Sequence, residues 1–114
     1  MTGMPRRRRT AQERTNAPRV TERVFQAQVE QYARLCGWLC YHTRYSMGST
    51  GVGFPDLLCL RGGVMCVAEL KSATGKTTEA QEQWLFSFRA VPGARVFLWR
   101  PDDESWAEIE RELR

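Results

Sequence analysis

The spacing of apolar residues changes several times along the chain, and each change marks a different predicted element. From Thr21 to Cys36 apolar residues recur every three or four positions, the spacing of one face of an amphipathic helix. Thr21 is a suitable N-cap for this helix, and Gly37 is a suitable stop. The stretch "WLCYHT", residues 38–43, then predicts a first strand.

Two apolar runs separated by a glycine pair predict a β-hairpin. Asp56–Arg61 and Val64–Lys71 are the predicted strands, and Gly62-Gly63 suits a tight two-residue turn between them. Both runs are apolar at odd and even positions alike. Such strands are usually central in a sheet and covered by helices on both sides.

The last third of the chain predicts a helix, a strand and another helix. Thr78-Glu79-Ala80-Gln81 has the capping-box pattern and opens a helix that ends at Pro92-Gly93. Residues 94–100 predict a fourth strand, and 103–113 predict a final helix. The predicted order is α-β-β-β-α-β-α. The fold class is therefore α/β, or α+β, with a mixed four-stranded sheet flanked by helices.

Charge divides the chain into a tail and a domain. The 114 residues suit a single domain, assigned to 20–114, and the formal net charge is +4. Residues 1–19 alone carry about +5, lack apolar periodicity and predict a disordered tail. Arginines Arg6, Arg7, Arg8 and Arg9 of this tail have two interpretations. They bind nucleic-acid phosphates, or the tail only adds solubility or derives from cloning.

Several classes of protein are disfavoured by the composition. There is neither a signal-peptide core nor an apolar run of 18 residues, so we expect a soluble cytoplasmic protein with no membrane partner. The four cysteines form no CxxC pair, and His42 is the only histidine. Buried reduced thiols are therefore expected in preference to a zinc site. His42 itself fits a strand-end core histidine better than a general base.

The hairpin turn predicts that three ionisable groups meet at the open end. Pairing Arg61 with Val64 places Asp56 opposite Glu69, with Cβ atoms about 4.5–5.5 Å apart. Lys71 projects from the same face as Glu69. Two carboxylates at about 5 Å repel by roughly 3 kcal/mol at an effective dielectric near 20. A divalent cation would offset this, and oxygen ligands favour Mg²⁺ or Mn²⁺. The alternative is a cross-strand salt-bridge cluster, worth at most about 1 kcal/mol.

The same residues resemble a known family. "GFPDLLCL" followed by "VMCVAELKS" resembles the PD-(D/E)xK nuclease motif, and more narrowly a stand-alone VRR-NUC domain. Further matching features are the first helix with Glu22 and Gln26, the "YHT" strand, the glycine- and serine-rich loop, the "Q..WL" helix and the "VFLWRP" strand. The resemblance covers about residues 20–110.

The resemblance implies a restriction-endonuclease-like core and a Mg²⁺- or Mn²⁺-dependent DNA endonuclease without an organic cofactor. Members resemble Holliday-junction resolvases, act on branched DNA and are often homodimers, in many cases from phages. A phage-encoded protein would act in the host cytoplasm. The resemblance implies that Asp56, Glu69 and the backbone of Leu70 bind the metal. Lys71 would position water or stabilise charge on the phosphate.

Other residues have two interpretations each. Glu22 heads the buried stripe of the first helix and is either a third metal-shell acid or a glutamate favoured by the helix dipole. Gln81 is either an auxiliary catalytic residue or only the capping-box glutamine. Lys76 either contacts phosphate or is solvated. The loop from Arg44 to Gly53 either binds phosphate or only connects two strands, and its candidate DNA contacts are Arg44, Ser46, Ser49 and Thr50.

Two rival functions remain open. One is a non-catalytic nucleic-acid-binding protein on the same fold, and the other is a sequence-specific nuclease of restriction type. A symmetric cut through two strands would need a homodimer. Trp99 and Trp106, taken as exposed aromatics, are the candidates for the dimer surface.

Overall fold

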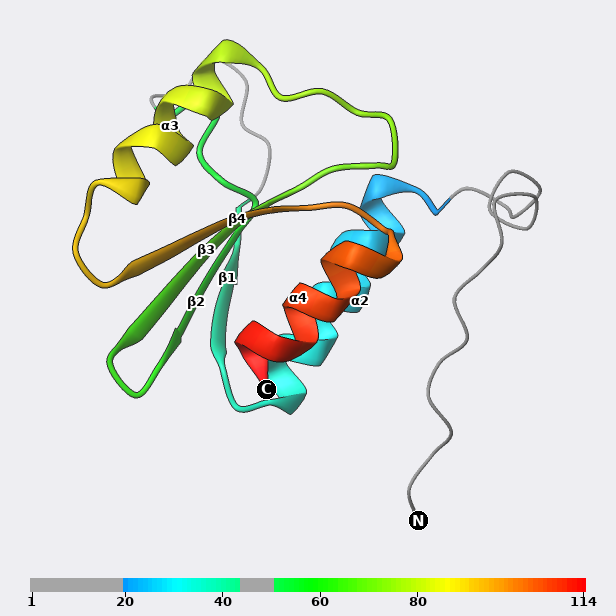
Figure 1. Cartoon of the computed structure of the whole chain (residues 1–114), viewed down its shortest axis with the longest axis vertical. Coiled ribbons are helices and arrows are strands. Elements are labelled where there is room, and N and C mark those ends of the chain that lie inside the picture. The colour runs from blue at the N-terminus through cyan, green and yellow to red at the C-terminus, as the bar shows by residue number, and fades with distance from the viewer. Residues whose placement is uncertain (1–19, 44–50) are drawn as a thin grey trace.

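The computed structural model of the protein describes residues 20–43 and 51–114, and the predicted tail and most of the predicted phosphate-binding loop lie outside them. The elements are α2 (Glu22–Leu35), β1 (Leu39–His42), β2 (Leu57–Arg61), β3 (Val64–Leu70), α3 (Glu79–Arg89), β4 (Ala94–Trp99) and α4 (Asp103–Leu113) (Figure 1). The α/β class and the mixed four-stranded sheet are confirmed. Each element lies within one residue of its predicted bounds, except that α3 ends at Arg89, three residues before the predicted stop at Pro92.

The sheet has the order β1-β2-β3-β4. β1 pairs antiparallel with β2, β2 pairs antiparallel with β3, and β3 pairs parallel with β4. Gly62 and Gly63 adopt φ angles of 55° and 81°, which only glycine reaches without strain in such a turn. Arg61 lies opposite Val64 and Leu57 opposite Ala68, so the predicted hairpin register is confirmed.

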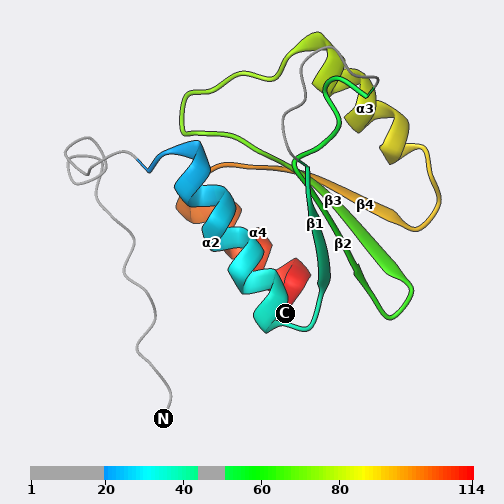
Figure 2. The same cartoon turned by 180° about the vertical axis from the view of Figure 1, so that it is seen from behind.

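One face of the sheet is covered by two helices. α2 and α4 lie side by side against it, while α3 lies on the other side (Figures 1 and 2). Phe25 and Val29 of α2 and Ile109 of α4 are fully buried there. The ring of Trp106 meets Phe25 edge-on, with centroids 5.8 Å apart. Thr21 caps α2 as predicted, since its hydroxyl accepts a hydrogen bond from the Val24 amide at 3.1 Å.

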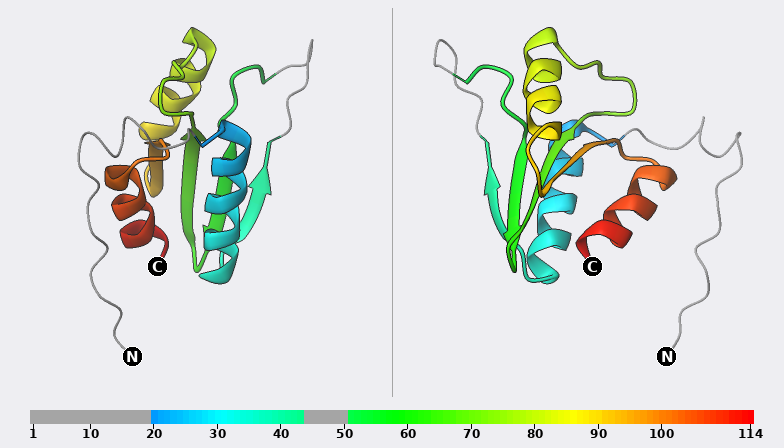
Figure 3. Two further views of the ribbon diagram at one scale, coloured as in Figure 1. Left: turned by 90° about the vertical axis from the view of Figure 1, so that its right-hand side faces the viewer. Right: turned by 60° about the vertical axis from the view of Figure 1, so that its left-hand side comes forward.

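The other face is only half covered, which corrects the expectation of helices on both sides. α3 packs over β3 and β4, where Leu85 is buried. In the described part of the chain no helix covers the β1–β2 half, and β1 forms the outer edge of the sheet (Figure 3). Leu39, Tyr41 and Leu60 are consequently 72%, 62% and 43% exposed. A single helix is about 10 Å wide, which is about the width of two strands spaced about 4.8 Å apart.

Three side chains lie in environments that the sequence did not indicate. Trp99 is buried, and its indole N–H donates to Glu108 Oε1 at 2.8 Å, so it is not a candidate for a dimer surface. Trp106 is half-buried against Phe25, so only part of its side chain is available for a dimer contact. His42 is exposed rather than in the core, and its Nε2 lies 3.0 Å from Gln26 Oε1.

All four cysteines, which lie among the described residues, are free thiols. Cys59 and Cys66 are buried as expected, whereas Cys36 and Cys40 are half-buried. The Sγ atoms of Cys40 and Cys59 lie 3.3 Å apart. Burial raises the pKa of Cys40, Cys59 and Cys66, so these thiols are protonated at neutral pH. In residues 20–43 and 51–114 no helix is both long and apolar enough to cross a membrane.

Candidate active site

The open end of the β2–β3 hairpin brings Asp56 and Glu69 together. Asp56 directly precedes β2, and Glu69 is the penultimate residue of β3. The pairing of Leu57 with Ala68, continued by one step, puts Asp56 opposite Glu69 as the sequence predicted. Asp56 Oδ2 accepts a hydrogen bond from the Leu70 amide at 2.8 Å. This bond holds the carboxylate of the first strand against the backbone of the second.

Strand alternation places these groups on the sheet face that α3 partly covers. Glu69 shares a face with buried Val67, and Lys71, two residues further on, continues the same row. Asp56 belongs to the same face because it lies opposite Glu69. The three groups therefore meet where β2 begins and β3 ends, on the face that α3 partly covers.

Glu69 is the most unusual residue of the site. Its side chain is 0% exposed, and among the described residues neither carboxyl oxygen has a hydrogen-bond partner. Burial, and after it the neighbouring Asp56, raise the pKa of Glu69 from 4.5 to about 9, and Lys71 offsets only part of this rise. Buried polar groups in native proteins are almost always paired. A pair of unpartnered oxygens beside a second carboxylate is the environment that a cation would complete.

Lys71 is buried next to this pair. Its side chain is 9% exposed, and its backbone amide donates to the Trp99 carbonyl at 3.0 Å. The ammonium lies close enough to Glu69 to lower the pKa of that carboxyl. A lysine so placed can neutralise charge that develops beside the two acids.

α3 holds the segment that leads into Asp56. Gly53 has φ of 86°, and a Cβ added there would lie 2.6 Å from the Ala80 carbonyl carbon, so its backbone packs directly on the helix. The indole N–H of Trp84 donates to the Val52 carbonyl at 3.0 Å. Phe54 meets the Trp84 ring at 5.1 Å. The glycine is therefore required for close approach, and the aromatic contacts fix the entry to β2.

Gln81 forms the predicted capping box. Its side-chain oxygen accepts from the Thr78 amide at 2.8 Å, and its own amide donates to the Thr78 hydroxyl at 3.2 Å. A Cβ added at Gly53 would lie 2.7 Å from the Gln81 amide nitrogen, so this residue also borders the loop before Asp56. The capping interpretation is confirmed, and the auxiliary catalytic role stays a prediction.

Glu22 is not brought to the acid pair. It lies in the first turn of α2, is exposed, and belongs to a helix that packs against the opposite face of the sheet (Figure 1). In residues 20–43 and 51–114 no three His, Cys, Asp or Glu side chains gather closely enough to hold a metal ion. The role of Glu22 as a metal ligand therefore stays a prediction. Asp56 and Glu69 are the two acids that do meet.

The predicted DNA contacts are mostly beyond the described residues. Lys76 is exposed in the loop before α3. The remaining candidates, Arg6, Arg7, Arg8, Arg9, Arg44, Ser46, Ser49 and Thr50, lie outside the described part of the chain.

Two residues that the sequence analysis did not assign also shape the site. Thr43 holds the approach to Asp56, since its hydroxyl donates to the Pro55 carbonyl at 2.8 Å and its amide to the Asp56 carbonyl at 2.9 Å. Arg100 contacts the turn after Lys71. Each is the last residue of a predicted strand whose end lies beside the motif, and this position is the signal that could have identified them.

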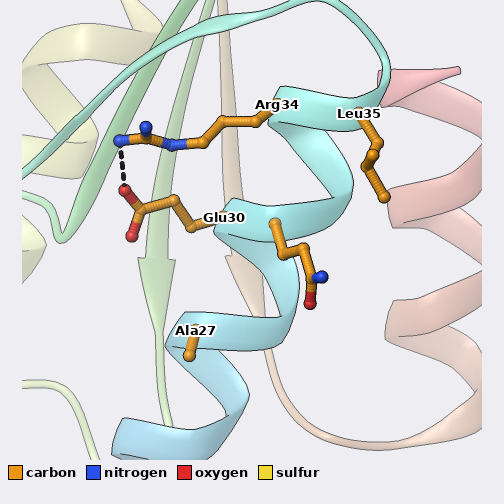
Figure 4. Close-up of a pocket in the computed structure, with 5 residues that line it drawn as sticks. Ala27, Glu30, Arg34 and Leu35 are labelled. Atoms are coloured by element: carbon orange, nitrogen blue, oxygen red, sulfur yellow. Dashed lines mark hydrogen bonds and ion pairs between the residues drawn. The ribbon is translucent and has the colours of Figure 1, made fainter.

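A shallow hollow of about 380 Å³ lies elsewhere, on the outer side of α2 (Figure 4). Ala27, Glu30, Gln31, Arg34 and Leu35 line it. Glu30 and Arg34 form an ion pair at 2.7 Å across one helical turn. The hollow shares no residue with the acid pair, and its charges neutralise each other.

Comparison with protein-family models and with curated proteins finds no match to the chain.

Proposed function

We propose that this protein is a divalent-metal-dependent DNA endonuclease of the PD-(D/E)xK superfamily, of the VRR-NUC type with restriction-endonuclease-like topology. The observation that carries the proposal is the buried Glu69 carboxyl, which has no partner in the described part of the chain and lies opposite Asp56. Lys71 completes the motif within the same row.

The residues present fit a hard cation. Two carboxylates supply oxygen ligands, and the main chain at Leu70 adjoins both. Mg²⁺ or Mn²⁺ commonly takes one or two carboxylates and keeps water or phosphate oxygens in its other positions, so two acids are enough. Bound there, the ion would polarise the scissile phosphodiester and lower the pKa of a water. Glu22 does not meet the two acids, so the proposed site rests on Asp56, Glu69 and the main chain at Leu70.

Each residue then has a definite role in phosphodiester hydrolysis. Asp56 and Glu69 hold the cation, with Asp56 oriented by the Leu70 amide. Lys71 orients the attacking water and stabilises charge on the phosphate. We propose electrostatic support, and not proton abstraction, as the role of Lys71, because its ammonium lies beside the two acids. Products with 5′-phosphate and 3′-hydroxyl ends follow from the family resemblance.

The substrate and assembly are part of the same proposal. Six arginines within residues 1–19, together with exposed Lys76, supply cations for the phosphate backbone. We propose branched DNA, such as a Holliday junction, as the preferred substrate and a homodimer as the active form, in the cytoplasm of the host if a phage encodes the protein. One site per subunit and two-fold symmetry suit paired cuts.

The rivals are a non-catalytic DNA-binding protein and a sequence-specific nuclease. A binder gains nothing from acids at a surface that meets phosphate, and the buried Glu69 carries a free-energy cost that binding alone does not require. A sequence-specific enzyme needs elements that reach base edges, and the described residues contain little beyond the core elements.

The test incubates the full chain with linear duplex, single-stranded, flap and four-way-junction DNA in Mg²⁺, Mn²⁺ or EDTA. We expect metal-dependent cleavage, fastest on branched DNA, that falls at least about a hundredfold in Asp56→Asn and Glu69→Gln. Glu104→Gln, an exposed acid in the first turn of α4, is the matched control and should cleave normally. DNA binding without cleavage under any metal would favour the non-catalytic rival.

A further inference from the structure

The turn that follows β3 folds back over Lys71. Ser72 Oγ accepts a hydrogen bond from the Gly75 amide at 3.0 Å, which closes the turn on itself. A Cβ added at Gly75 would lie 3.6 Å from Lys71 Cδ, so the turn is in van der Waals reach of the lysine's alkyl chain. This packing explains why a lysine at the end of a strand is only 9% exposed.

Arg100, which directly follows the neighbouring strand β4, fastens this turn. Its Nη1 donates to the Ser72 carbonyl at 2.8 Å and to the Gly75 carbonyl at 2.6 Å. Its backbone amide donates to Ser105 Oγ at 2.9 Å, and Trp99, the residue before it, accepts from the Lys71 amide at 3.0 Å. The arginine therefore links the turn to the end of β4 and to the first turn of α4.

The Arg100 guanidinium donates hydrogen bonds to main-chain carbonyls and not to a carboxylate. None of the ion pairs within residues 20–43 and 51–114 includes Arg100. Its charge-assisted bonds are stronger than neutral ones, and both end on the turn that covers Lys71. A solubilising surface arginine would make neither contact. The arrangement is that of a clamp on one short turn.

We propose that Arg100 is a positioning residue for Lys71. By holding residues 72–75 over the alkyl chain, it limits the lysine to conformations that direct the ammonium toward the Asp56–Glu69 pair. The catalytic part of this inference rests on the proposed nuclease function. The structural part, that Arg100 controls the accessibility of Lys71, does not.

Lysine labelling tests the structural part directly, because Lys71 and Lys76 are the only lysines of the chain. The full-length protein is treated with a water-soluble acetylating reagent, and the rates at the two lysines are read by mass spectrometry. We expect exposed Lys76 to react first in the natural protein. Arg100→Gln should raise the ratio of Lys71 to Lys76 labelling at least about tenfold, since two charge-assisted bonds are lost.

The matched control is Arg95→Gln. Arg95 is an exposed arginine on the same strand, with one long contact of 4.0 Å to Glu112, and its loss should leave the ratio unchanged. Circular dichroism and melting confirm that each variant folds. Ser72→Ala is a second route to the same effect, because it removes the hydroxyl that accepts from the Gly75 amide and closes the turn, while Arg100 stays in place. Unchanged labelling of Lys71 in folded Arg100→Gln and Ser72→Ala variants would overturn the inference.

Cleavage assays separate this inference from the proposed function. If the protein cuts DNA, Arg100→Gln should lower kcat about tenfold or more with little change in KM or in metal affinity, and Arg100→Lys should restore part of the loss. Wild-type cleavage by an Arg100→Gln protein whose Lys71 labels freely would reject the catalytic role alone. Absence of cleavage by the natural protein would reject the nuclease proposal, while the labelling ratio would still decide the role of the clamp.

Discussion

The two ends of the β2–β3 hairpin differ in whether their ionisable side chain has hydrogen-bond partners. At the turn end, Arg61 lies 4.3 Å above the Trp38 ring and donates to the carbonyls of Cys36, Leu113 and Arg114 at 2.7, 3.2 and 3.1 Å. At the open end, Glu69 is buried with no hydrogen-bond partner among the described residues. The same two strands thus carry one fully satisfied ion and one orphaned acid.

This difference indicates which end is structural and which is functional. The Arg61 contacts join the C-terminal ends of α2 and α4 to the hairpin, so charge there adds to stability. The isolated Glu69 carboxyl lowers stability, and a fold keeps such a group when it has another use. Substitutions at the two ends should therefore have opposite consequences.

The largest expected effect is on the pH dependence of stability. The pKa of Glu69 is 4.5 ordinarily and about 9 in the folded protein, so the unfolded chain releases this proton first. Stability is then highest below pH 4.5 and falls as the pH rises toward 9. We compare the free energies of unfolding of Glu69→Gln and the natural protein in EDTA. The difference, variant minus natural, should increase by about 1.4 kcal/mol per pH unit, or about 4 kcal/mol from pH 5 to pH 8.

Urea unfolding followed by circular dichroism at several pH values measures this difference, and contributions from groups distant from Glu69 cancel in the comparison. Glu104→Gln, an exposed acid, should run parallel to the natural protein. If the Glu69→Gln and natural curves also stay parallel between pH 5 and pH 8, the orphaned-acid description of the open end is wrong.

A smaller effect is expected from matched glycines at the two ends. Gly53 and Gly63 have φ of 86° and 81°, but a Cβ at Gly53 would lie 2.6 Å from backbone of α3, whereas one at Gly63 would meet nothing within 4 Å. Gly53→Ala should cost about 3 kcal/mol or more from clash and backbone strain. Gly63→Ala should cost only the strain, about 1–2 kcal/mol. Equal losses in urea unfolding would show that α3 does not hold the approach to Asp56.

The smallest effect concerns the satisfied charge. Arg61→Met keeps much of the alkyl chain but loses the cation–π contact and the bonds to three carbonyls, so it should cost about 2 kcal/mol. Arg111→Met removes an exposed arginine whose one ion pair spans 3.6 Å, and should change stability by less than about 0.5 kcal/mol. Thermal melts at one pH compare them. If Arg61→Met leaves the stability unchanged, the contrast between the two ends of the hairpin is wrong.

Local signals were enough to predict the elements and the register. Thr21 and Thr78 cap their helices as their patterns indicate, and Gly62-Gly63 alone sets the pairing that brings Asp56 opposite Glu69. Helix caps and two-residue turns depend on neighbours within four positions, which a single sequence displays in full.

Long-range features could not be predicted in the same way. Leu39, Tyr41 and Leu60 have the same apolar pattern whether or not a helix covers them, so the bare half of the sheet was not foreseen. Trp99 was misjudged because its partner, Glu108, belongs to the next helix. The lack of a partner for Glu69 within the described residues is a property of the packed molecule and leaves no trace in the sequence.

The most direct measurement is metal binding without DNA. Mn²⁺ and Mg²⁺ are titrated into the apo protein near pH 8 by calorimetry and by thermal shift, with Asp56→Asn, Glu69→Gln and Glu104→Gln alongside. The proposed site predicts saturable binding that raises the melting temperature of the natural protein and of Glu104→Gln, and that is lost in both hairpin variants. Equal shifts in all four proteins, or none in the natural one, would contradict the assignment of Asp56 and Glu69 to a cation.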